Sequence, residues 1–264
     1  MTLHLIERIA VDDDGEGDAM VCVHGLGGSS NSFTPLMAAL ARHRVLRIDL
    51  PGSGRSQQAE GDITLQRFVD SVQGICARLN IARAHFVGHS MGTIVCQHLA
   101  VVAPKLVRSL ALFGPLLAPA DTARSNLRAR GAKARGEGAM AMQEIAAALL
   151  QASVSADTRQ RLPVAVAFVR ESLLRQHGEC YGRTCEALAE MPAADVQRIE
   201  VPVLLVTGED DVVAPPQTVR AMAERFHHAR GVRVVVLPRC GHWTPIERPE
   251  ECTRELREFL ATLR

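Results

Sequence analysis

The sequence predicts an α/β fold in which a mostly parallel sheet is flanked by helices. Short apolar runs of strand length alternate with amphipathic stretches of helix length along most of the 264 residues, and this alternation is typical of a parallel sheet wrapped by helices. The rhythm is interrupted between residues 115 and 195, where no run resembles a strand. We therefore expect residues 1–114 and 196–264 to form the core domain and residues 115–195 to be a helical insertion over one edge of the sheet.

Six runs rich in leucine or β-branched residues are expected to be strands, because each is short and bounded by residues that end strands. In chain order they are residues 19–23, 44–50, 84–89, 107–113, 201–208 and 232–238. The leading segment LHLIERIAVDD is interpreted as an edge strand or one arm of a hairpin, and DDDGEGD contains the turn that follows it.

Amphipathic stretches between these runs are expected to be helices. They lie near residues 33–41, 65–79, 91–103, 216–229 and 249–262. Pro215, Pro216 and Pro249 stand where the last two begin, and proline is favoured in the first turn of a helix.

Composition and charge argue against several kinds of partner. The 30 Lys and Arg residues balance 29 Asp and Glu residues, so no overall basic field would hold a nucleic acid, and seven Phe, one Tyr and one Trp offer few rings for stacking bases. No apolar run approaches the roughly 18 residues of a membrane span, and the first 20 residues are too acidic for a signal peptide. Seven cysteines without a CxxC pair fit a reducing compartment. We therefore expect a cytoplasmic protein with no membrane or nucleic-acid partner.

The segment GHSMG (residues 88–92) lies between a predicted strand and a predicted helix. This context fits a G-x-S-x-G nucleophile elbow, in which a sharp strand-to-helix turn presents the serine. Glycines at both ends leave room for the strained serine backbone. Ser90 is therefore the candidate nucleophile, and a helix N-cap serine is the alternative interpretation.

A serine nucleophile needs a histidine within hydrogen-bond reach and an acid that orients the histidine. Asp210 and Asp211 follow the predicted strand at 201–208, and His242 follows the last predicted strand. Both positions lie at the carboxyl ends of parallel strands, where open α/β sheets place their sites.

Five motifs together are similar to those of the α/β-hydrolase superfamily, and the resemblance extends over essentially the whole chain. They are VHGLGG (23–28), DLPGSGRS (49–56), GHSMG (88–92), GEDDVVAP (208–215) and CGHW (240–243). The resemblance implies an α/β-hydrolase fold with a helical cap at residues 115–195. It also implies a Ser90, Asp211 and His242 triad, because the family's acid stands three residues after the glycine and four before the proline; Asp210 is the alternative acid.

The resemblance further implies an oxyanion hole formed by the backbone N–H groups of Leu26 and Met91, and a reaction without a metal or other cofactor. Two departures from the family pattern carry expectations. The amino-terminal arm is shorter than the two leading strands of relatives, so one edge strand is expected to be missing. Thr93 stands where many relatives have a glycine and is expected to narrow the space beneath the helix start.

Further residues are candidates for the substrate pocket. They are His24, His89, Trp243, Phe168, Tyr181, Arg124 and Arg128. Arg124, Arg128 and Arg135 share one helical face by spacing and could hold a substrate carboxylate, with Arg170 and Arg175 as further candidates. The alternative roles are loop shaping for the histidines, packing for the aromatic residues and a solvated face for the arginines.

Ser90 favours acyl-enzyme chemistry, because haloalkane dehalogenases and epoxide hydrolases of this superfamily use a carboxylate at the elbow. Epoxide hydrolases also use cap tyrosines to activate the epoxide, and this chain has a single tyrosine. The predicted cap and residues 181–188 look most like the 3-oxoadipate enol-lactonase and small carboxylesterase branch, so we expect a small-molecule ester or lactone substrate. The scarcity of aromatic residues favours a small aliphatic or alicyclic acyl group.

Two other functions stay open on the sequence. CGHW is similar to carbon–carbon bond hydrolases that cleave vinylogous 1,5-diketones from ring cleavage, although His89, Thr93 and Ile246 depart from that branch. A non-catalytic ligand receptor on the same fold is the third hypothesis. The sequence also leaves a homo-oligomer open.

Overall fold

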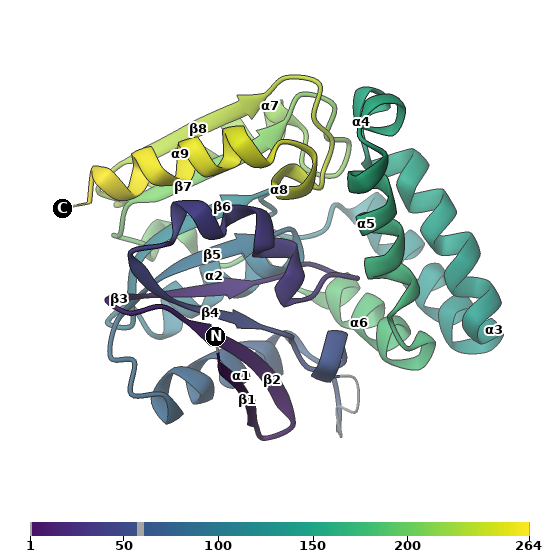
Figure 1. Cartoon of the computed structure of the whole chain (residues 1–264), viewed down its shortest axis with the longest axis horizontal. Coiled ribbons are helices and arrows are strands. Elements are labelled where there is room, and N and C mark those ends of the chain that lie inside the picture. The colour runs from purple at the N-terminus through teal and green to yellow at the C-terminus, as the bar shows by residue number, and fades with distance from the viewer. Residues whose placement is uncertain (1, 57–60, 264) are drawn as a thin grey trace.

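A computed structural model describes residues 2–56 and 61–263 and shows an eight-stranded sheet with helices on both faces (Figure 1). The strands are β1 (Thr2–Ile6), β2 (Ile9–Asp14), β3 (Asp18–Val23), β4 (His43–Ile48), β5 (Ala84–His89), β6 (Val107–Phe113), β7 (Val203–Gly208) and β8 (Val232–Leu237). Their order across the sheet is β1-β2-β4-β3-β5-β6-β7-β8. The six predicted strands therefore form β3 to β8.

The leading segment forms a complete hairpin. β1 pairs antiparallel with β2, which pairs antiparallel with β4. The six strands β3 to β8 are parallel to one another. Glu7 and Arg8 both have positive φ (50° and 67°), as in the tight turns that join two strands without a longer loop. The expectation of a missing edge strand is therefore wrong, because this turn fits two strands into the short arm.

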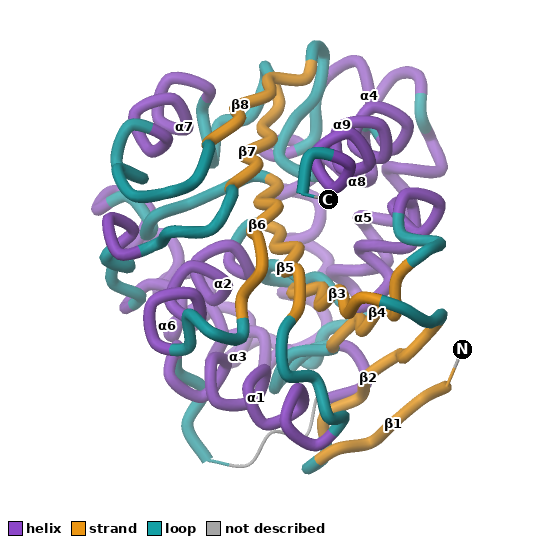
Figure 2. The backbone as a smooth tube through the Cα atoms, turned by 90° about the vertical axis from the view of Figure 1, so that its left-hand side faces the viewer, coloured by secondary structure: helices purple, strands orange, loops and turns teal. Residues whose placement is uncertain are grey.

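Helices pack on both faces of the sheet, as Figure 2 shows edge-on. One face is covered by α1 (Leu65–Arg78), α2 (Met91–Val102) and α7 (Pro216–Ala223), and the other by η1 (Ser30–Ala39) and α9 (Pro249–Ala261). Phe68 and Leu99 are buried on the first face, and Phe33 and Phe259 on the second. Every residue of β5 is buried, as expected for a central strand covered on both sides.

Five local elements differ from the sequence predictions. The first helix is a 3-10 helix, η1, with Pro35 inside it, and proline cannot donate the hydrogen bond of an α-helical interior. The helix α7 ends at Ala223 and continues as tight turns through Phe226. The short helices η2 (Gly54–Ser56), η3 (Val196–Arg198) and α8 (Thr244–Glu247) were not predicted.

The interruption in the strand rhythm consists of four helices, which we call the insertion. They are α3 (Asp121–Ser153), α4 (Ala156–Arg161), α5 (Pro163–Leu174) and α6 (Gly178–Glu190), on the right of Figure 1. Most of their buried apolar residues form a separate cluster, which Trp243 and Ile246 join from the core, whereas Leu127 and Leu188 belong to the core cluster. The division at residues 115 and 195 stays a prediction.

Two features are absent from the described residues, a helix that could cross a membrane and a disulfide bond. No helix among them is both long and apolar enough to cross a membrane. All seven cysteines are described and buried, and none of them forms a disulfide.

Candidate active site

Ser90 occupies a strained turn between β5 and α2. Its backbone has φ 52° and ψ −121°, a conformation that costs on the order of 1–3 kcal/mol in a residue with a side chain. The turn is packed closely, because a Cβ atom on Gly92 would lie 2.0 Å from the Val23 carbonyl oxygen and one on Gly25 would lie 2.7 Å from Ser90 Cβ. The serine is thus held rigidly at the carboxyl end of a central strand.

Thr93 ties this turn to the segment that leads into the insertion. Its hydroxyl donates to the Ser90 carbonyl oxygen (2.6 Å) and accepts from the Leu116 N–H (3.0 Å). Gln97 donates to the Leu116 carbonyl oxygen (2.7 Å). Thr93 therefore makes polar contacts that glycine could not.

His242 connects Ser90 to Asp211. Its Nε2 atom is 2.8 Å from Ser90 Oγ, and its Nδ1 atom is 2.9 Å from Asp211 Oδ2. The other oxygen, Asp211 Oδ1, accepts from the N–H groups of Val213 and Ala214, each at 2.8 Å. Asp210 is exposed. The structure thus brings the three predicted triad residues together with Asp211 as the partner of His242.

The buried Asp211 carboxylate is stabilised in its charged form. Burial alone would raise the pKa of Asp211, but the His242 ring and the two backbone N–H donors outweigh it and lower the pKa. An ionised carboxylate can only accept a hydrogen bond, so the network assigns the hydrogen of His242 to Nδ1 and the acceptor lone pair to Nε2. This tautomer can accept the Ser90 proton.

The loop that carries His242 is held by Glu247, which is 1% exposed. Its carboxylate accepts hydrogen bonds from three backbone N–H groups, those of Gly241 (3.0 Å), Trp243 (3.0 Å) and Ser155 (2.9 Å). His242 N–H itself donates to the Ser153 carbonyl oxygen (2.8 Å). The loop is therefore attached to the insertion on both sides of the histidine. Glu247 is not among the predicted site residues, and its only signal in the sequence is an acidic residue about one helical turn after His242.

The amides of Leu26 and Met91 are available to a ligand. No described group accepts a hydrogen bond from either N–H. Met91 is the first residue of α2, where the helix dipole favours negative charge. These two amides remain the candidate oxyanion hole.

A cavity of about 300 Å³ opens above Ser90, and Leu26, Tyr181, His242 and Trp243 are among its lining residues. Most of its wall is apolar, with Leu116, Leu127, Leu149, Leu188, Val212 and Val213. Among the described residues that line the cavity, Arg130 is the only Lys, Arg, Asp or Glu. Two of the predicted pocket residues, Tyr181 and Trp243, thus lie in this cavity.

The two predicted pocket histidines shape loops and do not line this cavity. His24 is buried and accepts a hydrogen bond from the Leu50 N–H at Nε2 (2.9 Å). His89 Nε2–H donates to the His242 carbonyl oxygen (2.9 Å). Burial lowers the pKa of His89 to about 3, so this ring is neutral and acts as a fixed donor.

The predicted arginine face contacts α6 and does not line the cavity. Arg124 donates to the carbonyl oxygens of Ala189 and Met191, Arg128 pairs with Glu190 (2.6 Å), and Arg135 pairs with Glu179 (3.1 Å) and Glu186 (2.9 Å). The reason is that α6 packs along this side of α3. Arg170 is exposed, and Arg175 lines the other cavity described next.

Phe168 also lies outside the Ser90 cavity. It lines a separate cavity of about 250 Å³ between α5 and the loops after β3 and β4, together with Asp49 and Arg55. Its position follows from the orientation of α5, which turns this residue towards those loops.

Arg130 lines the Ser90 cavity but is not among the predicted pocket residues. Residues 123, 126, 127 and 130 all line the Ser90 cavity, and they follow the i, i+3, i+4, i+7 spacing of one helical face. This spacing is the signal that could have found Arg130, because it defines a face separate from that of Arg124 and Arg128.

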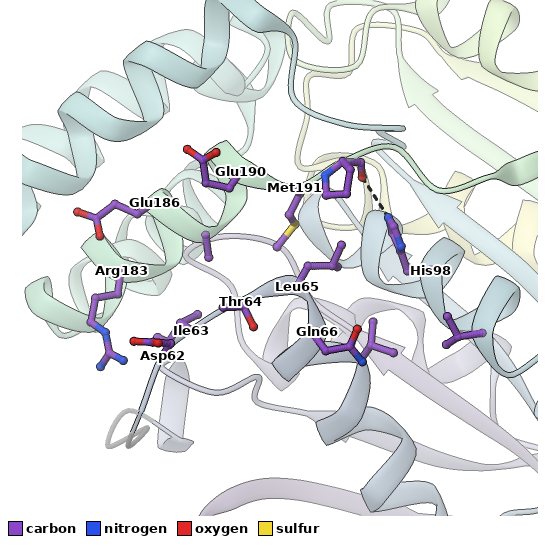
Figure 3. A pocket seen from close by; sticks show the side chains of 14 residues that line it. Asp62, Ile63, Thr64, Leu65, Gln66, His98, Arg183, Glu186, Glu190 and Met191 are labelled. Carbon is purple, nitrogen blue, oxygen red and sulfur yellow. Dashed lines mark hydrogen bonds between the residues drawn. The ribbon is translucent and has the colours of Figure 1, made fainter.

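A larger cavity of about 620 Å³ lies away from the triad, between α6 and the start of α1. Figure 3 shows Arg183, Glu186 and Glu190 along α6, opposite Leu65 and Gln66 of α1. None of the predicted triad residues lines it. Within the described ranges, no three His, Cys, Asp or Glu residues are grouped to hold a metal ion.

Comparisons with known proteins identify chains of similar fold and sequence. An enol-lactonase structure from Burkholderia xenovorans LB400 has a TM-score of 0.87 and 29% identity, covering 98% of this chain and all (100%) of that one. An esterase from Thermogutta terrifontis, solved with malate bound, has a TM-score of 0.89 and 26% identity, covering 97% and 93%. A 2-hydroxymuconate semialdehyde hydrolase of Pseudomonas putida is 28% identical, covering 96% and 91%. A model of the alpha/beta hydrolase fold family matches residues 18–249, and the chain therefore belongs to that family.

Proposed function

We propose that this protein is a serine hydrolase that cleaves a small carboxylic ester or lactone through an acyl-enzyme. The observation that carries the proposal is the chain of hydrogen bonds from Asp211 through His242 to Ser90 (2.9 and 2.8 Å), which ends on a strained turn beneath a largely apolar cavity. The similarity to an enol-lactonase and an esterase supports this choice of substrate.

In the first half-reaction, Ser90 Oγ attacks the substrate carbonyl carbon while its proton passes to His242 Nε2. The N–H groups of Leu26 and Met91 donate to the oxyanion that forms, and the Asp211 carboxylate stabilises the imidazolium. The tetrahedral intermediate then collapses and the bond to the leaving oxygen breaks. That oxygen takes the proton from His242 Nε2.

In the second half-reaction, a water molecule gives a proton to His242 Nε2 and attacks the acyl carbon. The bond to Ser90 Oγ breaks, Ser90 regains its proton from His242, and the carboxylic acid product leaves. With a lactone, the acid and alcohol are two ends of one product. A cavity of about 300 Å³ with a largely apolar wall suits a small aliphatic or alicyclic acyl group.

Turnover of p-nitrophenyl acetate and butyrate tests the proposal. We expect a burst of p-nitrophenol and labelling by a serine-directed phosphonate with the wild type, and neither with Ser90→Ala at an unchanged Tm. Asp211→Asn should lower kcat by about 1,000- to 10,000-fold because the histidine tautomer is lost, whereas Asp210→Asn should stay near the wild type. A folded wild-type protein that neither turns over esters nor reacts with the phosphonate would contradict the proposal.

Carbon–carbon bond hydrolysis is the second candidate, because the 2-hydroxymuconate semialdehyde hydrolase of Pseudomonas putida is similar over nearly the whole chain. The same serine and histidine would serve that reaction. Product analysis separates the two: cleavage of a vinylogous 1,5-diketone by a protein that ignores both esters would favour this candidate.

A further inference from the structure

We propose that Arg130 and Tyr181 form a carboxylate-binding subsite in the cavity above Ser90, so that the preferred ester or lactone carries a carboxylate group. The inference rests on the proposed hydrolase function and adds the charge of the substrate to it. Both residues line the same cavity as Ser90 and His242, although they come from α3 and α6.

The first observation is the uncompensated charge of Arg130. The other basic residues of α3 each have a carboxylate partner: Arg124 with Asp121, Arg128 with Glu190, Lys133 with Glu144, and Arg135 with Glu179 and Glu186. No described carboxylate pairs with Arg130, which is half-buried, and no Asp or Glu lines the cavity among the described residues. A single cation in a poorly solvated cavity attracts an anionic ligand more strongly than it would in water.

The second observation is the hydroxyl of Tyr181, a residue that is 1% exposed. This hydroxyl is buried, and the Arg130 guanidinium and the Cys185 thiol lie close to it. Arg130 and Tyr181 are therefore neighbours at the wall of the cavity. Burial raises the pKa of Tyr181 although the nearby Arg130 opposes the rise, and the phenol therefore stays a proton donor.

Together the two side chains match the chemistry of a carboxylate. A guanidinium presents planar N–H donors that fit carboxylate oxygens, and the Tyr181 hydroxyl adds a further donor. The Tyr181 ring also lies beside the predicted oxyanion loop, since its Cε2 atom would be 3.5 Å from a Cβ atom on Gly27. The subsite is therefore close to the loop that would hold the reacting carbonyl.

A matched pair of esters tests the subsite. One is p-nitrophenyl hydrogen adipate, and the other is p-nitrophenyl 6-methylheptanoate, in which an isopropyl group replaces the carboxylate. We expect the wild type to have the higher kcat/KM for the acidic ester. Arg130→Gln should raise KM for the acidic ester by about 10- to 100-fold, the range of a hydrogen bond to a charged group, and change the neutral ester by less than about threefold.

Two further variants separate the subsite from general effects. Arg128→Gln removes a neighbouring exposed arginine of α3 outside the cavity and should leave both esters unchanged. Tyr181→Phe should raise KM for the acidic ester alone, because it removes the hydroxyl beside Arg130 and keeps the buried ring. Equal effects of Arg130→Gln on the two esters, or equal effects of Arg130→Gln and Arg128→Gln, would overturn the subsite.

Binding without turnover keeps this test independent of the hydrolase proposal. Calorimetry on Ser90→Ala should show adipate bound more tightly than hexanoate, and adding Arg130→Gln should weaken adipate by at least about tenfold. That result would support the subsite even if the wild type hydrolysed neither ester. Ester turnover with no preference for adipate in the binding experiment would overturn the subsite and leave the hydrolase proposal standing.

Discussion

At the scale of single residues, Glu247 holds the loop that carries His242 through hydrogen bonds to backbone N–H groups. Its two oxygens hold the N–H groups on either side of the histidine and one at the start of α4. Hydrogen bonds from three backbone N–H groups fix this buried carboxylate in one position. The geometry of the triad therefore depends on a residue that touches none of its members.

The variant Glu247→Gln tests this dependence. One of the carboxylate oxygens becomes an NH₂ group that faces an N–H donor, so we expect the free energy of unfolding to fall by about 1–3 kcal/mol and kcat for p-nitrophenyl butyrate to fall by at least about tenfold with KM nearly constant. Glu255→Gln is the control, because Glu255 is also buried but pairs with Arg233 and Arg254. This variant should lower the free energy of unfolding and leave kcat unchanged. If Glu247→Gln lowers the free energy of unfolding but leaves kcat unchanged, Glu247 does not position His242.

At the scale of elements, a break in the helix divides α3 into two segments. Gly138, with φ 58° and ψ −130°, interrupts its 33 residues. Before the break, α3 contributes Leu127 and Arg130 to the cavity. After it, Leu149 lines the same cavity, and Met142 and Leu150 pack in the cluster that contains Trp243. The change of direction lets one segment both cover the cavity and return to the core, as its path in Figure 1 shows.

Two neighbouring glycines in α3 should respond oppositely to alanine. A Cβ atom meets nothing within 4 Å at either Gly136 or Gly138, and positive φ occurs only at Gly138 of the two. Gly136→Ala should therefore raise the free energy of unfolding by about 0.5–1 kcal/mol through helix propensity, and Gly138→Ala should lower it by about 1–3 kcal/mol through strain. Urea unfolding measures both, and two changes of the same sign would show that the break is not a fixed feature of the fold.

The elements also explain which parts of the site could be predicted from the sequence. Ser90 lies in a strand–turn–helix whose glycine spacing is local, and Asp211 and His242 follow strands with clear apolar patterns, so these positions are visible in short windows. The spacing of α3 places Arg130 on one face with Leu127, but which face of α3 meets the cavity depends on how α6 packs against α3, a contact between residues distant in the sequence. For the same reason the pattern could place Arg124 and Arg128 on one face but not show that this face meets α6.

At the scale of the whole molecule, folding buries histidines that would otherwise titrate. Burial lowers the pKa of His85 from 6.5 to about 4, with the charges of Arg108 and His43 adding to the effect. Burial likewise lowers the pKa of His89. Between pH 4 and 6.5 the unfolded chain therefore binds more protons than the folded one. Stability rises with pH through this window and is lost as the pH falls from 6.5 towards 4.

His85→Gln should flatten this pH dependence. His85 lies at the start of β5, hydrogen-bonded to Ser109 (2.8 Å), at the end of the strand opposite Ser90. Removing one proton-binding group should reduce the slope of the unfolding free energy between pH 4.5 and 6 by up to about 1.4 kcal/mol per pH unit. Urea titrations of both proteins at several pH values check this, and parallel curves would show that His85 does not contribute.

The single indole of the chain has a practical consequence. Trp243 lines the cavity, lies 5.5 Å from the His89 ring between centroids, and donates from Nε1 to Ser153 Oγ (3.2 Å) where the insertion meets the core. All tryptophan emission from this protein therefore originates beside His242. The molecule contains its own optical reporter, and a shift or quenching of that emission would follow the filling of the cavity, or the parting of α3 from the core, without any added label.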